Sequence, residues 1–238
     1  MIFDPVDGVM RDEPSVPLVA EHILAEAAAM FRSRGYYKTR MQDIAQRFGV
    51  THAALYYHFK SKNDILAQIN LGAIGELLAG ARDIEALDLP AIDRFRQMAH
   101  AHFLWVAQNA ALASSLLNYD EELPPAAFEQ IRGLRREYSK ILRDVYREGV
   151  EDGSLADIDP RLAINFVIGS GNWISHWYHE GDSVAPAELA EIGMKLLADG
   201  FLRVQGARSP QPTPRSATGA ARSPRADPHA TQTPQRTA

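Results

Sequence analysis

Apolar residues recur every three to four positions from Leu18 to Val204. This spacing places apolar side chains on one face of an α-helix, whereas a half-buried strand would need strict alternation. No run of alternating β-branched residues interrupts the pattern. Glycine and proline divide it into consecutive helices, because glycine commonly ends a helix and proline commonly opens one. The sequence therefore predicts an all-α fold.

The N-terminal part of the pattern predicts three helices in close succession. The first begins near Leu18 and ends at Gly35, and the second ends at Gly49. Thr39 and Gln42 have the spacing of a capping box, in which side chains satisfy free N–H groups at a helix start. A short third helix is expected over residues 51–59. Two short helices joined by a tight turn behind a bracing helix are typical of a helix-turn-helix.

Longer helices are expected to follow, over residues 65–84, 90–109, 111–119, 126–153, 160–179 and 186–204. We expect an N-terminal helix-turn-helix domain over residues 18–64 and a C-terminal helical domain over residues 65–205. Residues 1–17 and 206–238 carry no apolar period, and the latter are rich in Pro, Arg, Ser and Thr. Such segments are expected to be a disordered arm and a disordered tail.

Composition and charge restrict the class of protein. The 238 residues are 46% hydrophobic and include no cysteine, so neither a disulfide framework nor a thiolate metal site is expected. No apolar run reaches the roughly 18 residues of a membrane span, and the acidic N-terminus lacks the order of a signal peptide. The sequence therefore predicts a soluble, cytoplasmic protein without membrane contact.

The net charge of −5 is unevenly distributed. Residues 20–64 carry seven Lys and Arg against four Asp and Glu, a charge of +3, whereas residues 65–206 carry twelve against twenty-one, a charge of −9. Residues 20–64 thus form a basic head and residues 65–206 an acidic body. This division indicates that the head binds a polyanion.

The third helix combines an apolar side with a polar, aromatic side. The side expected to pack inward consists of Val50, Ala54, Leu55 and Phe59, and the side left for the outside consists of Thr51, His52, Ala53, Tyr56 and Tyr57. His52 and Tyr56 are one turn apart, so both can reach base edges. Thr51 can cap the helix and donate to a phosphate, and Tyr57, His58, Lys60 and Lys62 can flank the groove as phosphate donors.

Alternatives remain open for three of these side chains. Tyr56 can instead brace the helix against its domain, and His58 is better explained as a structural or phosphate-side residue than as a base reader. His52 and His58 are six residues apart and share no helical face. No metal site is therefore expected there.

The run "MQDIAQRFGVTHAALYYHFKSKNDIL", preceded by "MFRSRGYYKTR", resembles the DNA-binding domain of TetR-family transcriptional regulators over Leu18–Gln68. The resemblance implies base contacts by His52, Ala53, Tyr56 and Gln42, and phosphate contacts by Thr51, Tyr57, His58 and Lys62. Many members carry Ser or Thr where this chain has Arg40. Either Thr39 takes over the cap or the helix starts one residue earlier, and Arg40 could reach a phosphate itself. Thr39 and Arg40 are therefore also candidate DNA-binding residues.

The same resemblance implies that the acidic body forms a homodimer and encloses a ligand pocket. Its last two helices, residues 161–179 and 187–204, would form the dimer contact. Gly169 and Gly171 destabilise a helix, and either a close helix approach or a ligand against the backbone would explain them. A two-fold dimer matches a palindromic double-stranded DNA operator.

Aromatic and polar residues of the middle helices are the pocket candidates. They are Met98, His102, Trp105, Leu116, Tyr119, Trp173, His176 and Trp177. Core packing is the alternative explanation for each aromatic side chain. His176 and His179 are three residues apart, but no third ligand is evident, so neither a metal nor a cofactor is expected.

The segment "NWISHWYHEGDSVAPAELAEIGMKLLADGF" resembles the C-terminal end of TetR-family members that respond to acyl-coenzyme A esters. Those members control fatty-acid, sterol or aromatic-acid breakdown. Arg132, Arg135 and Arg136 could serve a coenzyme A phosphate, although a solvated helix face is the favoured interpretation. The resemblance implies a repressor that its effector releases from DNA.

Three alternatives to this repressor follow from the sequence. A sensor of cationic drugs that represses an efflux gene is the alternative regulator, because the body is acidic. No nucleophile elbow, Gly-rich phosphate loop or pair of catalytic carboxylates is present, so an enzyme is not expected. A purely architectural DNA binder would leave the large acidic body unexplained.

Overall fold

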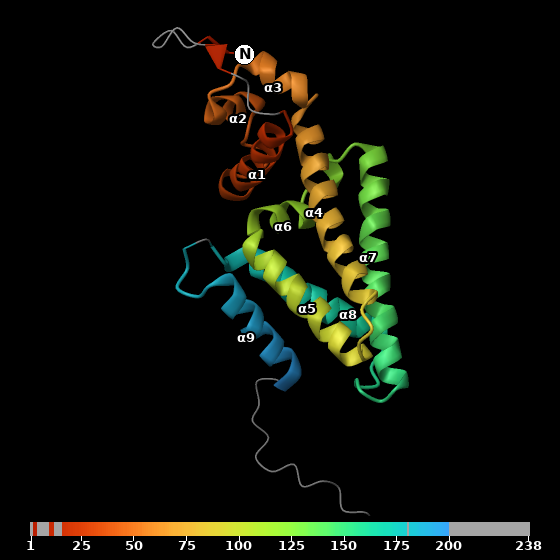
Figure 1. Ribbon diagram of the computed structural model, residues 1–238. Coiled ribbons are helices and arrows are strands. Elements are labelled where there is room, and N and C mark those ends of the chain that lie inside the picture. Colours follow the sequence, from red (N-terminus) through yellow and green to blue (C-terminus); the bar gives the residue numbers. More distant parts are fainter. Residues whose placement is uncertain (1, 4–9, 12–15, 180, 200–238) are drawn as a thin grey trace, which may run out of the picture. The chain divides into compact units, whose positions relative to one another are not determined.

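The computed structural model describes residues 2–3, 10–11, 16–179 and 181–199, which belong to one unit of the chain, Met1–Phe201. The described residues form nine α-helices and one short 3-10 helix (Figure 1). Their bounds are α1 Val16–Arg34, α2 Met41–Phe48, α3 His52–His58, α4 Lys62–Glu85, α5 Ala91–Gln108, α6 Ala110–Leu117, η1 Asp120–Glu122, α7 Pro125–Glu151, α8 Pro160–Trp177 and α9 Pro186–Asp199. The predicted all-α fold is confirmed.

The N-terminal arm differs from its prediction at the described positions. Strands β1 (Ile2–Phe3) and β2 (Met10–Arg11), of two residues each, pair antiparallel, and α1 begins at Val16. Backbone pairing and the helix start thus give regular structure to part of a segment predicted to be disordered. The rest of that arm, and the tail over residues 206–238, lie outside the described residues.

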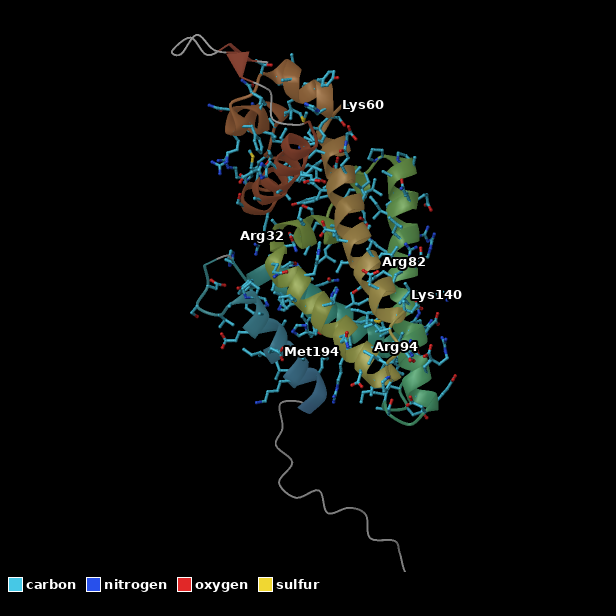
Figure 2. The ribbon with its side chains drawn as sticks, in the orientation of Figure 1. Arg32, Lys60, Arg82, Arg94, Lys140 and Met194 are labelled. Atoms are coloured by element: carbon cyan, nitrogen blue, oxygen red, sulfur yellow. The ribbon has the colours of Figure 1, made fainter. Side chains whose placement is uncertain are left out.

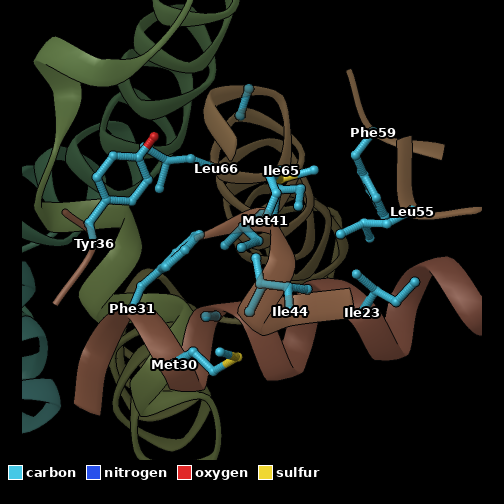
Figure 3. Close-up of a cluster of buried hydrophobic side chains, with 14 of the residues drawn as sticks. Ile23, Met30, Phe31, Tyr36, Met41, Ile44, Leu55, Phe59, Ile65 and Leu66 are labelled. Atoms are coloured by element: carbon cyan, nitrogen blue, oxygen red, sulfur yellow. The ribbon is translucent and has the colours of Figure 1, made fainter. Parts of the chain in front are cut away.

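The first three helices pack around one apolar cluster, shown in Figure 3. Ile23 and Phe31 of α1, Ile44 of α2 and Leu55 of α3 are each 1% exposed or less. Gly49, which ends α2, has a φ of 63°, a left-handed conformation that glycine adopts without steric cost. The chain therefore turns sharply there, and α3 begins three residues later.

The remaining helices form two further apolar clusters. α4 packs along α7 (Figure 1), and Ile74 of α4 shares a buried cluster with Leu142 of α7. α5 packs against α7, α8 and α9, and its Phe103 shares the other cluster with Ile174 and Leu189. Among the described residues, no helix combines the length and apolar composition that crossing a bilayer requires.

Two glycines allow α8 and α9 to approach α5 closely. A Cβ atom at Gly171 would lie 2.5 Å from Cδ2 of His102 and 2.7 Å from Cδ1 of Phe103. A Cβ atom at Gly193 would lie 2.8 Å from Cδ2 of Phe103, whereas one at Gly169 would meet nothing within 4 Å. Close helix approach within the chain therefore explains Gly171 but not Gly169.

Helix ends agree with the predicted ones to within three residues wherever the structure describes both. Residues 200–204 of the predicted last helix lie outside the described residues. The sequence did not predict η1, which lies in the connection between α6 and α7. Tyr119, which precedes it, has a φ of 68° and is the one non-glycine residue with a positive φ in the described ranges.

Candidate DNA-binding surface and effector cavity

Two buried side chains and a cap hold α3 in place. Leu55 and Phe59 are 0% and 1% exposed. The hydroxyl oxygen of Thr51 accepts the N–H of Ala54 at 3.1 Å, which confirms the predicted cap. Ala54 itself is exposed, so the prediction that it packs inward is wrong. One step along a helix rotates the side chain by about 100°, away from the side that carries Leu55.

The other side of α3 presents rings to solvent. His52, Ala53, Tyr56 and Tyr57 are all exposed, Tyr57 to 84%. The rings of His52 and Tyr56 meet edge to face with centroids 4.6 Å apart, as expected for residues one turn apart. This surface offers an imidazole and two hydroxyl groups, which can bond base edges and phosphate oxygens.

Further polar side chains surround this surface. Arg40 and Gln42 are exposed at the start of α2, and Lys60, labelled in Figure 2, is exposed just beyond α3. His58 is half-buried, and its ring lies edge-on to that of Tyr57 with centroids 5.2 Å apart.

Two predicted DNA contacts are instead used inside the protein. Thr39 is 1% exposed, and its hydroxyl donates to the carbonyl of Gly35 at 3.0 Å. The Nζ of Lys62 donates to the carbonyl of Tyr36 at 2.8 Å and lies 4.0 Å from the centre of that ring. Burial lowers the pKa of this ammonium group. Thr39 is thus not available to a phosphate, and Lys62 supports the turn between α1 and α2.

The start of α2 also differs from its prediction. Arg40 is the N-cap residue, and the carboxylate of Asp43 accepts its N–H at 2.9 Å. An arginine side chain has no acceptor, so only this half of a capping box can form. The predicted box between Thr39 and Gln42 is wrong because Thr39 faces inward and α2 begins two residues after it.

A cavity of about 250 Å³ lies within the C-terminal helices, bordered by α4, α5, α6, α7 and α8. Its walls are mainly apolar, with Ile74, Leu77, Trp105, Leu116 and Ile168 among them. Its polar side chains are His102, Arg135, Tyr138, Ser139 and Asn172. A few polar groups in an apolar enclosure are typical of small-molecule sites. Within the described ranges, no three His, Asp or Glu side chains gather so as to hold a metal ion.

A buried hydrogen-bonded pair forms one wall of this cavity. The Nδ1 of His102 lies 3.0 Å from the hydroxyl of Tyr138, and its Nε2 lies 3.4 Å from the carbonyl oxygen of Ile168. Burial lowers the pKa of His102 to about 4 and raises the pKa of Tyr138. His102 is therefore neutral near pH 7. Because a carbonyl can only accept, Nε2 carries the proton and Nδ1 accepts from Tyr138.

The structure brings three of the predicted pocket residues, His102, Trp105 and Leu116, to this cavity. Met98 is buried and borders a neighbouring cavity of about 90 Å³, which His102 and Trp105 also line. Tyr119 does not line the cavity, because its ring stacks on that of Tyr36 with centroids 5.0 Å apart.

Three candidates on α8 face away from the cavity. Trp173 and Trp177 are 62% and 47% exposed, and the ring of His176 stacks on Trp173 with centroids 4.7 Å apart. The buried positions of α8 are Ile164, Val167, Gly171, Ile174 and Ser175. Residues 173, 176 and 177 therefore lie on the opposite face of the helix, and their assignment to the pocket is wrong.

The sequence did not predict Tyr138 and Ser139 of α7 as cavity residues, and it favoured a solvated face for Arg135. Arg135, Tyr138 and Ser139 have the i, i+3, i+4 spacing of one helical face, a signal that could have grouped them. Arg132 and Arg136 are exposed, in agreement with the predicted solvated face. That interpretation is wrong for Arg135, whose side chain is 27% exposed and pairs with Asp120 at 2.9 Å.

The outer face of α8 carries an exposed apolar stripe. Leu162, Phe166, Trp173 and Trp177 are 50%, 77%, 62% and 47% exposed, and their spacing of four and seven residues places them on one side of the helix. Ile192, Leu196 and Leu197 of α9 are also exposed. Contiguous exposed apolar surface of this kind is typical of an interface between proteins.

Two family models match this chain. Residues 23–69 match the family described as bacterial regulatory proteins, tetR family. Residues 88–201 match the family described as Tetracyclin repressor-like, C-terminal domain. The first match covers α2 and α3, and the second includes the helices that carry the cavity's histidine and arginine.

Individual relatives agree with these matches. The transcriptional repressor KstR2 of Mycobacterium tuberculosis is 29% identical over 182 residues, which are 74% of this chain and 88% of KstR2. The crystal structure of AibR in complex with isovaleryl coenzyme A and operator DNA shares the fold, with a TM-score of 0.66, 21% identity and coverage of 74% and 96%. The TetR-family regulator PfmR of Thermus thermophilus is 32% identical with a TM-score of 0.69, over 76% of this chain and 99% of PfmR. This chain therefore belongs to the TetR family of transcriptional regulators.

Proposed function

We propose that this protein represses transcription by binding a palindromic double-stranded operator as a homodimer, in the cytoplasm, and that a small effector in the cavity releases it. The observation that carries the proposal is the exposed ring surface of α3. His52, Ala53 and Tyr56 would contact base edges, with Gln42 beside them. Arg40, Thr51, Tyr57, His58 and Lys60 would bond phosphates.

The effector that fits this cavity best is an acyl-coenzyme A ester with a small acyl group. About 250 Å³ lies just below the usual range of ligand-pocket volumes, about 300–1,000 Å³, so the cavity suits an acyl group better than a whole coenzyme. The apolar walls suit the hydrocarbon, and Arg135 suits a carbonyl or carboxylate oxygen. The solved complex of the related AibR with isovaleryl coenzyme A supports the same class of effector.

The polar remainder of such an ester would have room beside the cavity. The 90 Å³ cavity shares Leu77, His102 and Trp105 with the larger one, and it shares Ile84 and Ala101 with an open hollow. Arg96, His100 and Lys195 border that hollow, although Glu191 pairs with His100 at 3.2 Å. The two cavities and the open hollow follow one another, and the basic side chains of Arg96 and Lys195 at the hollow would favour phosphate groups.

A sensor of cationic compounds is less well supported. Binding a cation in a low-dielectric site needs a carboxylate or several aromatic faces against it. The side chains that line the 250 Å³ cavity include Arg135 but neither Asp nor Glu, and one tryptophan, Trp105. The 250 Å³ cavity therefore offers a bound cation no carboxylate of its own, and the carboxylate of Glu76, which borders the 90 Å³ cavity, already accepts the indole N–H of Trp105 at 2.7 Å.

The apolar stripe on α8, with its neighbours on α9, is the surface we assign to the dimer contact. A homodimer would remove Phe166, Trp173 and Trp177 from water and would place two copies of α3 on one duplex. Half-sites one turn of DNA apart, or a multiple of it, would then be read together.

The test begins with the operator, selected from a random duplex library with the full-length protein. Fluorescence anisotropy at fixed salt then measures its dissociation constant with and without a panel of acyl-coenzyme A esters, because affinity for DNA depends strongly on salt. Tight binding that one short-chain thioester weakens at least tenfold supports the proposal. Tight binding that no thioester changes, but that cationic dyes weaken, contradicts the effector class. Failure to select any sequence contradicts DNA binding.

A further inference from the structure

The turn between α6 and α7, residues 119–123, contacts the start of the helix-turn-helix. The Nδ2 of Asn63 donates to the carbonyl of Glu122 at 2.6 Å, and its Oδ1 accepts the hydroxyl of Tyr36 at 2.9 Å. Tyr119 stacks on the ring of Tyr36, and Leu123 is buried in the same cluster as α1, α2 and α3. The position of the 119–123 turn is therefore linked to the turn that precedes α2.

A second set of bonds joins the same turn to the cavity wall. The guanidinium of Arg135 makes two parallel bonds to the carboxylate of Asp120, at 2.9 and 3.1 Å. It also donates to the Oδ1 of Asn70 at 3.2 Å and to the carbonyl of Leu116. Arg135 and Leu116 both line the cavity. One side chain thus touches the effector cavity and holds the 119–123 turn.

The donors of Arg135 are not all used. Its Nε is buried and has no hydrogen-bond partner among the described residues. An unpaired buried donor is costly, and a guanidinium binds oxygen anions in pairs of bonds. An occupant of the cavity with a carbonyl or carboxylate oxygen would therefore be drawn to Nε. An oxygen group that bonds Nε and Nη2 together would compete with Asp120, because Nη2 also bonds that carboxylate.

We propose that the Arg135–Asp120 ion pair couples the cavity to the DNA-binding surface: when an oxygen group of the effector takes Arg135, Asp120 is released and the 119–123 turn loses its fixed position against Tyr36 and Asn63. This inference rests on the proposed function for the identity of the effector. Arg135 is then a positioning residue, and the effector favours the state in which the pair is broken, as a ligand must to shift an equilibrium.

The chain contains a matched control for this pair. Arg82 of α4 pairs with Glu137 of α7 at 2.5 Å, with side chains 55% and 44% exposed (Arg82 is labelled in Figure 2). It also involves α7, but neither residue borders the cavity or contacts the 119–123 turn. Glu137→Gln therefore removes an ion pair of similar chemistry without touching the proposed coupling.

The experiment is amide hydrogen exchange, read by mass spectrometry, on the full-length protein without effector. Asp120→Asn and Arg135→Lys both weaken the paired bonds, since lysine cannot make two parallel ones. We expect exchange on the order of tenfold faster, corresponding to about 1.4 kcal/mol, in peptides covering residues 35–41 as well as 119–123. Glu137→Gln should leave both peptides at the wild-type rate. The amide of Thr39, which donates to the carbonyl of Tyr36 at 3.2 Å, is the most informative reporter.

The outcome does not depend on finding an effector. Unchanged exchange over residues 35–41 in both variants would overturn the coupling, even if a thioester releases the wild-type protein from DNA. Faster exchange there, in a protein that no thioester releases, would keep the coupling and overturn only the effector class. Far-ultraviolet circular dichroism distinguishes either result from unfolding, and Arg135→Lys, which keeps the charge, provides the milder variant.

Discussion

Replacing Gly171 with alanine should destabilise the protein, although alanine is the better helix former. The new Cβ atom would lie 2.5 and 2.8 Å from Cδ2 and Nε2 of His102, and 2.7 Å from Cδ1 of Phe103. Both rings are 2% exposed, so neither can swing into solvent. Overpacking of this kind costs about 1–3 kcal/mol, whereas the gain in helix propensity is about 1 kcal/mol. The difference is a net loss of up to about 2 kcal/mol, and the three contacts under 3.0 Å favour the upper part of that range.

Gly169→Ala is the matched control on the same helix. Within the protomer a Cβ atom there would meet nothing within 4 Å, so helix propensity should raise the stability of the protomer by about 0.5–1 kcal/mol. Urea denaturation measures the free energy of unfolding of both variants and the wild type. All three are compared at one protein concentration, because the stability of a dimer depends on concentration. A Gly171→Ala protein as stable as Gly169→Ala would refute the close approach of α8 to α5. His102 borders the cavity, so Gly171→Ala should also weaken effector release.

Three other predictions concern DNA binding and pH. Tyr56→Ala should weaken specific operator binding by about tenfold to a hundredfold, with affinity for scrambled DNA nearly unchanged, in the anisotropy assay; an unchanged specific affinity would remove Tyr56 from base contact. Thr51→Ala and Ser61→Ala should each lower the free energy of unfolding by about 1 kcal/mol, because each removes the hydroxyl that caps a helix, α3 or α4. Only Thr51→Ala should also weaken DNA binding. Because burial lowers the pKa of His102 to about 4, the unfolded chain binds a proton below about pH 6.5 that the folded chain does not. The free energy of unfolding should therefore fall as the pH falls from 6.5 towards 4, and in His102→Asn that decline should be shallower by up to about 1.4 kcal/mol per pH unit. Urea denaturation at several pH values measures both proteins. If the free energy of unfolding depends on pH in the same way in the variant and the wild type, His102 is not a buried neutral histidine.

The predictable parts of this fold depend on local signals. Glycine and proline end and open helices through backbone geometry, so helix ends could be read from single positions such as Gly49 and Pro160. The exposed side of α3 could be predicted because Leu55 and Phe59, one turn apart, fix which side is buried. These inferences need only the few residues on either side.

The errors arose where the answer depends on distant residues. The partners of Arg135 are Asp120 and Asn70, fifteen and sixty-five positions away, and no pattern around Arg135 indicates them. Tryptophans such as Trp173 and Trp177 occur both in ligand cavities and in subunit interfaces, so the residue type does not show which of the two their face of α8 meets. Helical spacing groups such residues on one side, but only the packing of α8 on α5 decides which side that is.

Phe103 has a consequence for how this chain can change over evolution. Its ring is buried between α5, α8 and α9, where Gly171 and Gly193 leave space for it. A larger residue at Gly193 would require a smaller one at position 103, whereas a larger residue at Gly171 would require changes at both positions 102 and 103. Related sequences that have lost Gly193 should therefore also have lost the aromatic ring, and those that have lost Gly171 should have lost the histidine as well.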